Sequence, residues 1–441
     1  MFKKVMPLSA ILSLRFLGLF LVLPVISAYA ASMTDNLILV GIVVGGYALT
    51  QAAFQLPFGI LSDKIGRKVT IFIGLIIFLI GSIICAISDD IYMLMLGRFL
   101  QGTGAIGSVI TAMISDLVHE EVRAKAMAMM GGSIALSFAL AMGLGPVLSA
   151  SYGTEILFWI TAVLSVMAMV ILFSKVPTPP RIRHIYKHQT TTKEILKDSD
   201  LLRLTITGAL QKGLMSIAFL IIPIVMLGSV EDGGFAWDKS ELWKVYVPAM
   251  VVGLLAMGPA AVFGEKKNKP KLMFLIAIFF FALSFFLMGL ATTASTFIVG
   301  VISFFIGFNM LEPLLQSMIT KFAKVHQKGA ALGISNTFAY LGTFIGGTLA
   351  GLSLEIFNRE ILGIALGVVS LAWLAWTFGM RDPIKYSHLF IPLSEIDESK
   401  LENLDSDGVS QYYINETEKL AVFKYDAQLI SEDDLKIKVG N

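Results

Sequence analysis

The chain is dominated by long apolar runs separated by short polar turns. A helix needs about 20 consecutive apolar residues to cross the hydrocarbon core of a bilayer, and these runs approach or exceed that length. The pattern therefore predicts an α-helical membrane protein with twelve spans. We expect the spans at residues 7–30, 38–61, 69–87, 91–115, 127–150, 155–174, 202–228, 242–263, 272–291, 294–319, 329–354 and 360–379.

Composition supports this interpretation. Hydrophobic residues make up 56% of the chain and charged residues 15%, and the mean hydropathy is +0.78. This balance excludes an ordinary soluble domain. A formal net charge of +2 gives no basic surplus for binding nucleic acid. Cys85 is the sole cysteine, which excludes an internal disulfide framework and a thiolate metal cluster.

The N-terminus is similar to a cleavable signal peptide, because Lys3 and Lys4 precede an apolar stretch that ends in small residues. We expect it to be retained as the first span. Arg15 interrupts the apolar stretch, the stretch is long enough to cross a bilayer, and many further spans follow it.

Lysine and arginine collect on one side of the predicted membrane region. They occupy the N-terminus, the turns after the second, fourth, eighth and tenth spans, and the long segment 175–200. The opposite loops carry acidic residues such as Asp89 and Asp90. By the positive-inside rule, both termini are expected to lie in the cytoplasm.

The turn after the second span reads Gly59-Ile-Leu-Ser-Asp63-Lys64-Ile-Gly66-Arg67-Lys68. It resembles the most diagnostic loop of the major facilitator superfamily. Gly59 permits close helix approach, and Asp63 can sit at the positive N-terminus of the next helix. The resemblance implies that this turn bonds to an acidic residue at the end of the fourth span and latches the outward-facing state. An interfacial salt bridge without that role is the alternative. The candidate latch residues are Gly59, Asp63, Gly66, Arg67 and Asp116.

The proline-rich segment 175–200 divides six spans from six. The turn at residues 261–269 is a degenerate repeat of the earlier turn, with Glu265 at the position equivalent to Asp63. This duplication indicates two related halves, as in the parallel repeats of the superfamily. We expect an N-terminal six-helix bundle with the central loop at 1–200, a second six-helix bundle at 201–385 and a cytoplasmic α/β domain at 386–441.

Four ionisable side chains fall well inside the predicted spans: Arg15, Arg98, Lys212 and Glu312. Each is costly in lipid unless it faces protein or water. They lie on the first, fourth, seventh and tenth spans, as expected if the first helix of each three-helix unit lines a central cavity. The resembled fold has these four helices around its cavity. The alternative for the two arginines is that they snorkel to the membrane edge or pair structurally.

Glu312 is the candidate proton carrier, because its position gives no easy route to the lipid headgroups. A Lys212–Glu312 pair would neutralise both charges, and a purely structural ion pair is the alternative. Asn309, one turn earlier, is expected to add a hydrogen bond in the cavity or to form a helix–helix contact.

Two further patterns match the superfamily. Leu96 to Ala105, which contains Arg98, resembles the arginine motif associated with proton coupling. Gly143 to Pro146 resembles the antiporter motif, although Ser149 and Ala150 stand where that motif has glycines. The alternative is structural: a Gly-Pro pair inside a membrane helix can bend the helix and let a neighbouring helix pack closely.

After Pro383 the composition becomes that of a soluble domain. The pattern predicts a strand at 388–393, a helix at 398–404, a hairpin from 409–414 and 420–425, and a second helix that starts at Ser431. This order resembles the ferredoxin-like tail of the YajR-type inner-membrane transporters of the superfamily. Lys212 departs from that group, in which a histidine is expected near this position. The tail has no Cys-x-x-Cys and only His388, so no metal is predicted.

We therefore expect a proton-coupled secondary transporter of the bacterial inner membrane, an efflux antiporter that moves a small solute by alternating access as a monomer. Its expected partners are the lipid bilayer, the solute and protons, with no nucleic acid. The alternative is a transporter-like sensor that signals through its cytoplasmic tail. No nucleophile–base set or phosphate loop is present, so neither an enzyme nor a cofactor is predicted.

Overall fold

The computed structural model describes residues 2–177, 192–231, 233–267, 269–323, 328–382, 386–396, 408–415, 418–426 and 429–439. Within these ranges twelve helical spans are long and apolar enough to cross a membrane, which confirms the predicted number. They consist of α1 (Phe2–Leu21), α3 (Leu37–Ile65), α4 (Arg67–Ala86), α5 with α6 (Ile91–Thr103 and Gly107–Leu117), α7 (Glu120–Tyr152), α8 (Glu155–Ser174), α10 (Ser199–Leu227), α11 (Trp243–Ala261), α12 (Pro270–Gly289), α13 (Ala294–Phe322), α14 (Lys328–Ile356) and α15 (Arg359–Phe378). Shorter elements are α2 (Ile26–Ala31), α9 (Thr192–Lys197), the 3₁₀ turn η1 (Lys239–Glu241) and the π-helical turn η2 (Val262–Lys266).

Two predicted spans are broken in the structure. The sequence predicts one helix over 7–30, but α1 ends at Leu21 and α2 begins at Ile26. Pro24 lies in this break, where it has no amide hydrogen to donate and disfavours helical geometry in the preceding residue. The predicted helix over 91–115 is interrupted at Gly104, which packs so closely on α4 that an added Cβ would lie 2.3 Å from the Gly74 carbonyl oxygen.

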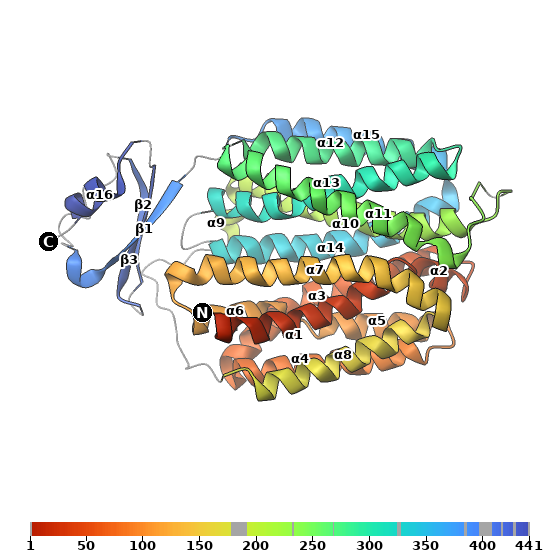
Figure 1. The fold of residues 1–441 in the computed structure, drawn as a ribbon, viewed down its shortest axis with the longest axis horizontal. Helices are drawn as coiled ribbons and strands as arrows, with labels where there is room; N and C mark the ends of the chain where they lie inside the picture. The colour runs from red at the N-terminus through yellow and green to blue at the C-terminus, as the bar shows by residue number, and fades with distance from the viewer. Residues whose placement is uncertain are drawn as a thin grey trace.

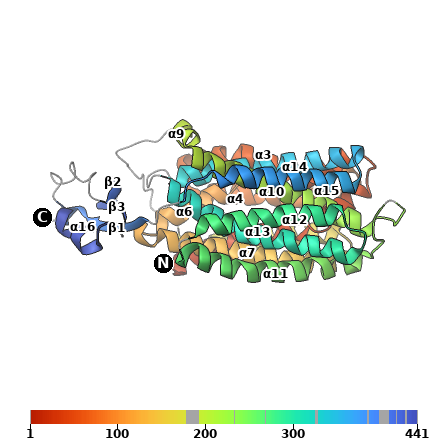
Figure 2. The same ribbon diagram turned by 90° about the horizontal axis from the view of Figure 1, so that it is seen from above.

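The spans form two bundles that lie side by side (Figure 1). The first bundle contains the spans from α1 to α8, and the second contains those from α10 to α15. The C-terminal sheet lies beyond one end of the bundles in both views (Figures 1 and 2). The N-terminus lies at the same end. We call this end the tail end and the opposite end the far end.

Helices α3 and α14, one from each bundle, touch at the far end. A Cβ added to Gly41 would lie 2.1 Å from the Gly347 carbonyl oxygen, and one added to Gly351 would lie 2.0 Å from the Leu37 carbonyl oxygen. Backbone meets backbone here because these glycines have no side chain to keep the helices apart. The two bundles are therefore sealed together at this end by direct helix contact.

Hydrogen bonds join the bundles at the far end as well. The Ser27 hydroxyl donates to the Phe219 carbonyl at 3.1 Å, and the Lys239 ammonium donates to the Thr154 hydroxyl at 2.9 Å. Toward the tail end, the helices at the same interface carry glycines around which an added Cβ would meet nothing within 4 Å, namely Gly59, Gly131, Gly132, Gly258, Gly329 and Gly333. The bundles are thus closed at the far end and apart at the tail end.

The tail forms a three-stranded antiparallel sheet with the strand order β1-β3-β2. Its elements are β1 (Tyr386–Pro392), η4 (Leu393–Glu395), β2 (Val409–Asn415), β3 (Leu420–Asp426) and α16 (Glu432–Val439). The three strands and the last helix confirm the predicted pattern, and the Ser431 hydroxyl accepts a hydrogen bond from the Asp434 amide at 3.1 Å. The helix predicted at 398–404 lies outside the described residues. Buried side chains from the strands and α16 give this small α/β domain its own core.

The glycine contact predicts that bulk at Gly41 opens the far end. Gly41→Leu places a side chain where the Gly347 carbonyl now lies, so α3 and α14 must separate. A cysteine at Ser216, which is buried beside Gly347, then reacts faster with a membrane-impermeant maleimide added from the far side. The reporter carries Cys85→Ala, and Gly333→Leu is the control because its site is open. An unchanged labelling rate for Gly41→Leu contradicts the seal.

Candidate functional site

A lysine and a glutamate meet within the second bundle. Lys212 on α10 and Glu312 on α13 form an ion pair with 2.8 Å between Nζ and Oε2, which confirms the predicted contact. Gln211 donates a second hydrogen bond to the same oxygen at 3.0 Å. The side chains of Lys212 and Glu312 are 25% and 41% exposed. Because charged groups in a membrane span must face water or protein, this exposure places the pair on the opening between the bundles.

An aromatic layer lies between this pair and the far end. Phe305 and Phe308 precede the glutamate on α13, which runs from the far end to the tail end. Phe138 of the first bundle packs against Phe308 and Phe219, with ring centroids 5.7 and 6.3 Å apart. Tyr246 stacks on Phe219 at 5.9 Å. These rings cover the glutamate on its far-end side.

Asn309 does not point at the ion pair. Its Nδ2 donates to the Phe305 carbonyl at 2.9 Å and lies 4.0 Å from the sulfur of Met250 on α11. The residue is buried. In this conformation Asn309 therefore makes the helix–helix contact that the sequence allowed as one of its two roles.

Arg98 is fully buried inside the first bundle. Its Nε donates to the Val43 carbonyl at 3.2 Å, and its Nη1 donates to Gln101 Oε1 at 2.8 Å. The guanidinium carbon lies 4.6 Å from the centre of the Tyr47 ring, which is a cation–π contact. Complete burial contradicts the alternative in which this arginine snorkels to the membrane edge.

Arg15 is enclosed in the same way. Its Nη2 lies 3.3 Å from Gln51 Oε1 and 3.5 Å from the Gln101 carbonyl oxygen. Its guanidinium carbon lies 5.6 and 5.2 Å from the ring centres of Phe16 and Phe78. Among the residues that the structure describes, no carboxylate is paired with either arginine. Polar side chains, backbone carbonyls and aromatic ring faces therefore stabilise both charges in place of water.

The four charges predicted to line one cavity thus occupy two environments. In this conformation Lys212 and Glu312 are exposed, whereas aromatic rings cover the arginines. Tyr340 on α14 reaches from the second bundle to the first. It packs against the cluster that contains Tyr47 and Phe78. Sequence reasoning missed Tyr340, since a lone tyrosine in an apolar helix does not reveal which bundle it faces.

The charged turn after α3 forms the predicted contacts. Arg67 pairs with Asp63 at 2.6 Å and with Asp116 at 3.0 Å. It also donates to the Ser62 hydroxyl. All of these residues belong to the first bundle, so the cluster is intact while the two bundles are apart at the tail end.

Two glycines of the turn have different roles. Gly66 has a φ of 100°, a backbone conformation that residues with a side chain rarely adopt, and it ends α3 directly before Arg67. Gly59 has no neighbour that an added Cβ would meet within 4 Å. The close helix approach predicted for Gly59 is therefore not made in this open conformation.

The sequence matches the family profile described as Major Facilitator Superfamily over residues 8–347 and again over 235–402. The chain belongs to the major facilitator superfamily. Like its family and its relatives, it is a transporter embedded in the lipid bilayer, and it is not an enzyme.

Its relatives include the Inner membrane transport protein YajR of Escherichia coli (strain K12), which is 34% identical over 442 residues and covers 97% of this chain and 95% of the relative. Multidrug resistance protein 1 of Bacillus subtilis (strain 168) is 26% identical over 85% of this chain and 97% of its own length. The quinolone resistance protein NorA of Staphylococcus aureus (strain MRSA252) is 25% identical over 83% of this chain and 94% of its own length.

The fold is shared with solved transporters. A bacterial homologue of the human lysosomal transporter Spinster superposes with a TM-score of 0.68 at 15% identity, covering 85% of this chain and 95% of that one. The human organic anion transporter MFSD10 gives a TM-score of 0.65 at 17% identity, covering 85% of this chain and 99% of that one. At these identities the likeness concerns the fold alone.

The surroundings of Arg98 predict that lysine cannot replace it. A lysine at this position would keep the charge but lose the planar fork that reaches Val43 and Gln101 together. We expect Arg98→Lys to lower the thermal unfolding midpoint in detergent by about 3 °C or more. Lys64→Arg, an exchange on the exposed end of α3, leaves the midpoint unchanged and serves as the control. Equal midpoints for Arg98→Lys and the wild type would show that the bidentate contact is dispensable.

Proposed function

We propose that the protein is a proton-coupled secondary transporter that exports a small solute across a bacterial inner membrane by alternating access. The observation that carries this proposal is the partial exposure of the Lys212–Glu312 pair next to an aromatic layer. The ring of Phe138 packs on Phe308 on the far-end side of the pair, so we infer that the pair is reached from the tail end. One-sided access to a central charged site is what a carrier with two alternating states requires.

Glu312 is the proposed proton carrier. A carboxylate reached by water can take up a proton, and protonation removes the Coulomb attraction to Lys212. The ammonium of Lys212 then loses its counter-charge, so the arrangement of α10 and α13 that suits the ionised pair no longer suits the neutral acid. Proton binding thereby shifts the balance between the two states, because it interacts with them differently.

We place the tail end in the cytoplasm. The basic turns of the sequence, including the one around Arg67 and Lys68, lie at this end, and the positive-inside rule assigns them to the cytoplasmic side. The conformation described here is then open to the cytoplasm. In support, the similar Spinster homologue is described as inward-facing and occupied. The single chain contains both bundles, and we propose that it acts as a monomer.

Export is the direction favoured by the relatives. Two of them are named for resistance to drugs or quinolones, and YajR is named as an inner-membrane transport protein. The resemblance of Gly143 to Pro146 to the antiporter motif points the same way. We therefore propose proton antiport, in which an inward proton gradient drives the solute out.

Flux measurements in proteoliposomes test this function. We expect solute movement driven by an imposed pH gradient, and a protonophore abolishes it. A sensor would move no member of a broad solute panel under either condition. A flux that the protonophore does not change would remove proton coupling from the proposal.

Glu312 variants test the proton carrier. Glu312→Gln is expected to abolish transport against a gradient, since an amide cannot carry a proton at neutral pH, whereas Glu312→Asp retains part of it. Glu360→Gln makes the same change at an exposed position of α15 and is the matched control. If the Glu312→Gln variant still concentrates solute under a pH gradient, the glutamate is structural.

The charged turn is proposed to latch the tail end when it closes. Asp63 is 65% exposed while the bundles are apart, and closure brings the second bundle toward this turn. Burial would strengthen its pairing with Arg67, because screening by water falls. The cluster with Asp116 would then favour the closed tail end, which corresponds to the outward-facing state.

Asp63→Asn is therefore expected to shift the protein toward the conformation described here. A cysteine at Ser216 in the Cys85→Ala background should react more slowly from the far side. Asp89→Asn, at an exposed position of a far-end loop, provides the control. Unchanged reactivity together with full transport would remove the latch.

A further inference from the structure

The tail touches the first bundle through the turn between β2 and β3. Glu418 pairs with Arg123 at 3.2 Å, and both side chains are less than one-fifth exposed. Arg123 lies in the first turns of α7 and also reaches the Ser115 carbonyl at 3.5 Å. His119 lies 3.8 Å from Glu418 but is almost fully exposed, so it contributes little. This contact joins the tail to the corner between α6 and α7, near Asp116, which pairs with Arg67 of the charged turn.

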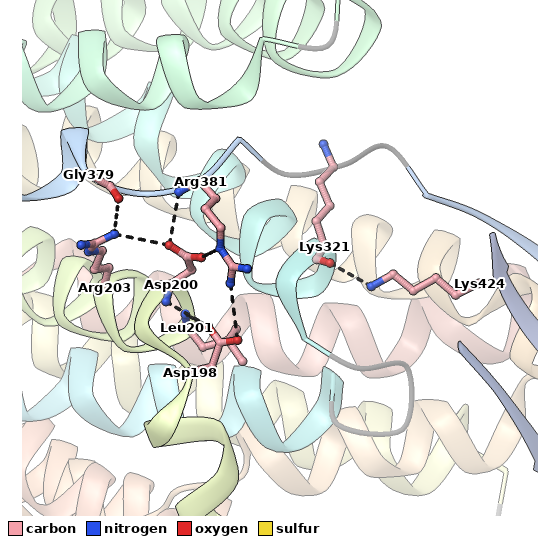
Figure 3. A network of polar contacts seen from close by, with 8 residues as sticks. All are labelled: Asp198, Asp200, Leu201, Arg203, Lys321, Gly379, Arg381 and Lys424. Atoms are coloured by element: carbon pink, nitrogen blue, oxygen red, sulfur yellow. Dashed lines mark hydrogen bonds and ion pairs between the residues drawn. The ribbon is translucent and has the colours of Figure 1, made fainter. Parts of the chain in front are cut away.

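The same hairpin touches the second bundle through Lys424 on β3. Its ammonium donates to the Lys321 carbonyl at 3.0 Å (Figure 3). It also lies 3.5 Å from the Ala323 carbonyl. These carbonyls end α13, where a cation is favoured by the helix dipole and by acceptors that have no partner within the helix. Lys424 is buried, and this burial lowers the pKa of its ammonium. The second anchor therefore lies on the helix that carries Glu312.

The hairpin is stiff between its two anchors. β3 is the central strand and pairs with β1 on one side and β2 on the other. The turn is fixed by a hydrogen bond from the Glu418 amide to Asn415 Oδ1 at 3.1 Å. Glu418 lies just before β3 and Lys424 lies within it. The rise per residue of an extended strand therefore holds their separation at about 20 Å or less.

The linker to the tail is tied to the second bundle. Arg381, which follows α15, pairs with buried Asp200 on α10, and Arg203 donates to the Gly379 carbonyl (Figure 3). The tail is thus held to the second bundle by its linker and by Lys424. Glu418 reaches across to the first bundle, where its ion pair with Arg123 is the shorter of its two contacts with charged groups among the described residues.

We propose that the tail is a brace that holds the two bundles at their separation in the tail-end-open state. This inference rests on the alternating-access cycle proposed above. When the tail end closes, the α6–α7 corner moves relative to the end of α13, and a stiff hairpin cannot follow both. The Glu418–Arg123 contact must break, since the other connections keep the tail on the second bundle. Docking of the tail therefore favours the open tail end, and closure in turn favours release of Glu418.

The test measures the distance between the bundles by electron paramagnetic resonance in lipid nanodiscs. The full chain carries Cys85→Ala with spin labels at Lys64→Cys and Lys267→Cys, two exposed positions at the tail ends of α3 and of η2. In this background we expect a majority of long distances. Glu418→Ala should move the ratio of long to short distances by about threefold or more toward short ones, in line with the loss of a partly buried charged contact.

Three variants sharpen the test. Lys424→Met removes the ammonium but keeps an apolar stem that can stay buried, and it should give the same shift as Glu418→Ala. Truncation after Tyr386 should match both, because a brace fails when either anchor is lost. Glu432→Ala removes an acidic residue that pairs with Lys436 within α16 and should change nothing.

The outcomes separate the brace from the transport cycle. Two distance populations that Glu418→Ala and Lys424→Met leave unchanged would overturn the brace, even if truncation alters them. A single population in every variant, including Gly41→Leu, would instead count against alternating access itself.

Discussion

The direct contact of α3 with α14 at the far end is the constraint on which the rest of this conformation depends. Glycine backbones approach there to distances that no side chain would allow, as at Gly41 and Gly347. Because both bundles are stiff, contact at one end leaves them apart at the other. The exposure of Glu312 and the span that the tail must bridge both follow from this wedge-shaped arrangement.

The wedge divides the charged residues of the membrane region into two kinds. Lys212 and Glu312 face the opening, where water offsets part of the cost of burying charge. Arg15 and Arg98 are enclosed by carbonyls, amides and ring faces in the first bundle. The enclosed guanidinium groups tie α1, α3 and α5 together, whereas the Lys212–Glu312 pair joins α10 to α13 at the opening.

Tyr340 and the tail connect the bundles at two levels. Tyr340 packs against the Tyr47 cluster of the first bundle within the membrane region, and the tail hairpin bridges Arg123 and the end of α13 outside it. The first connection ends on α14, and the second ends on α13, the helix that carries Glu312. The tail and Glu312 are therefore linked through one helix, α13.

The sequence by itself determined the features that depend on local composition and spacing. Twelve spans, the family, the three strands of the tail and the Lys212–Glu312 contact follow from apolar run length, a charged glycine turn, alternation along strands and the cost of lone charges in lipid. Even the contacts of Arg67 with Asp63 and Asp116 were implied by the resemblance.

Only the tertiary structure decided which way each side chain faces and how the bundles are tilted. The breaks at Pro24 and Gly104 rotate the helix segments that follow them, and whether Arg98 meets water or the Tyr47 ring depends on how these segments pack. The bridging contacts of Glu418 and Lys424 depend on how the tail lies against the first and the second bundle. Such contacts are set by the relative placement of surfaces far apart in the chain, which the local pattern of apolar and polar residues does not encode.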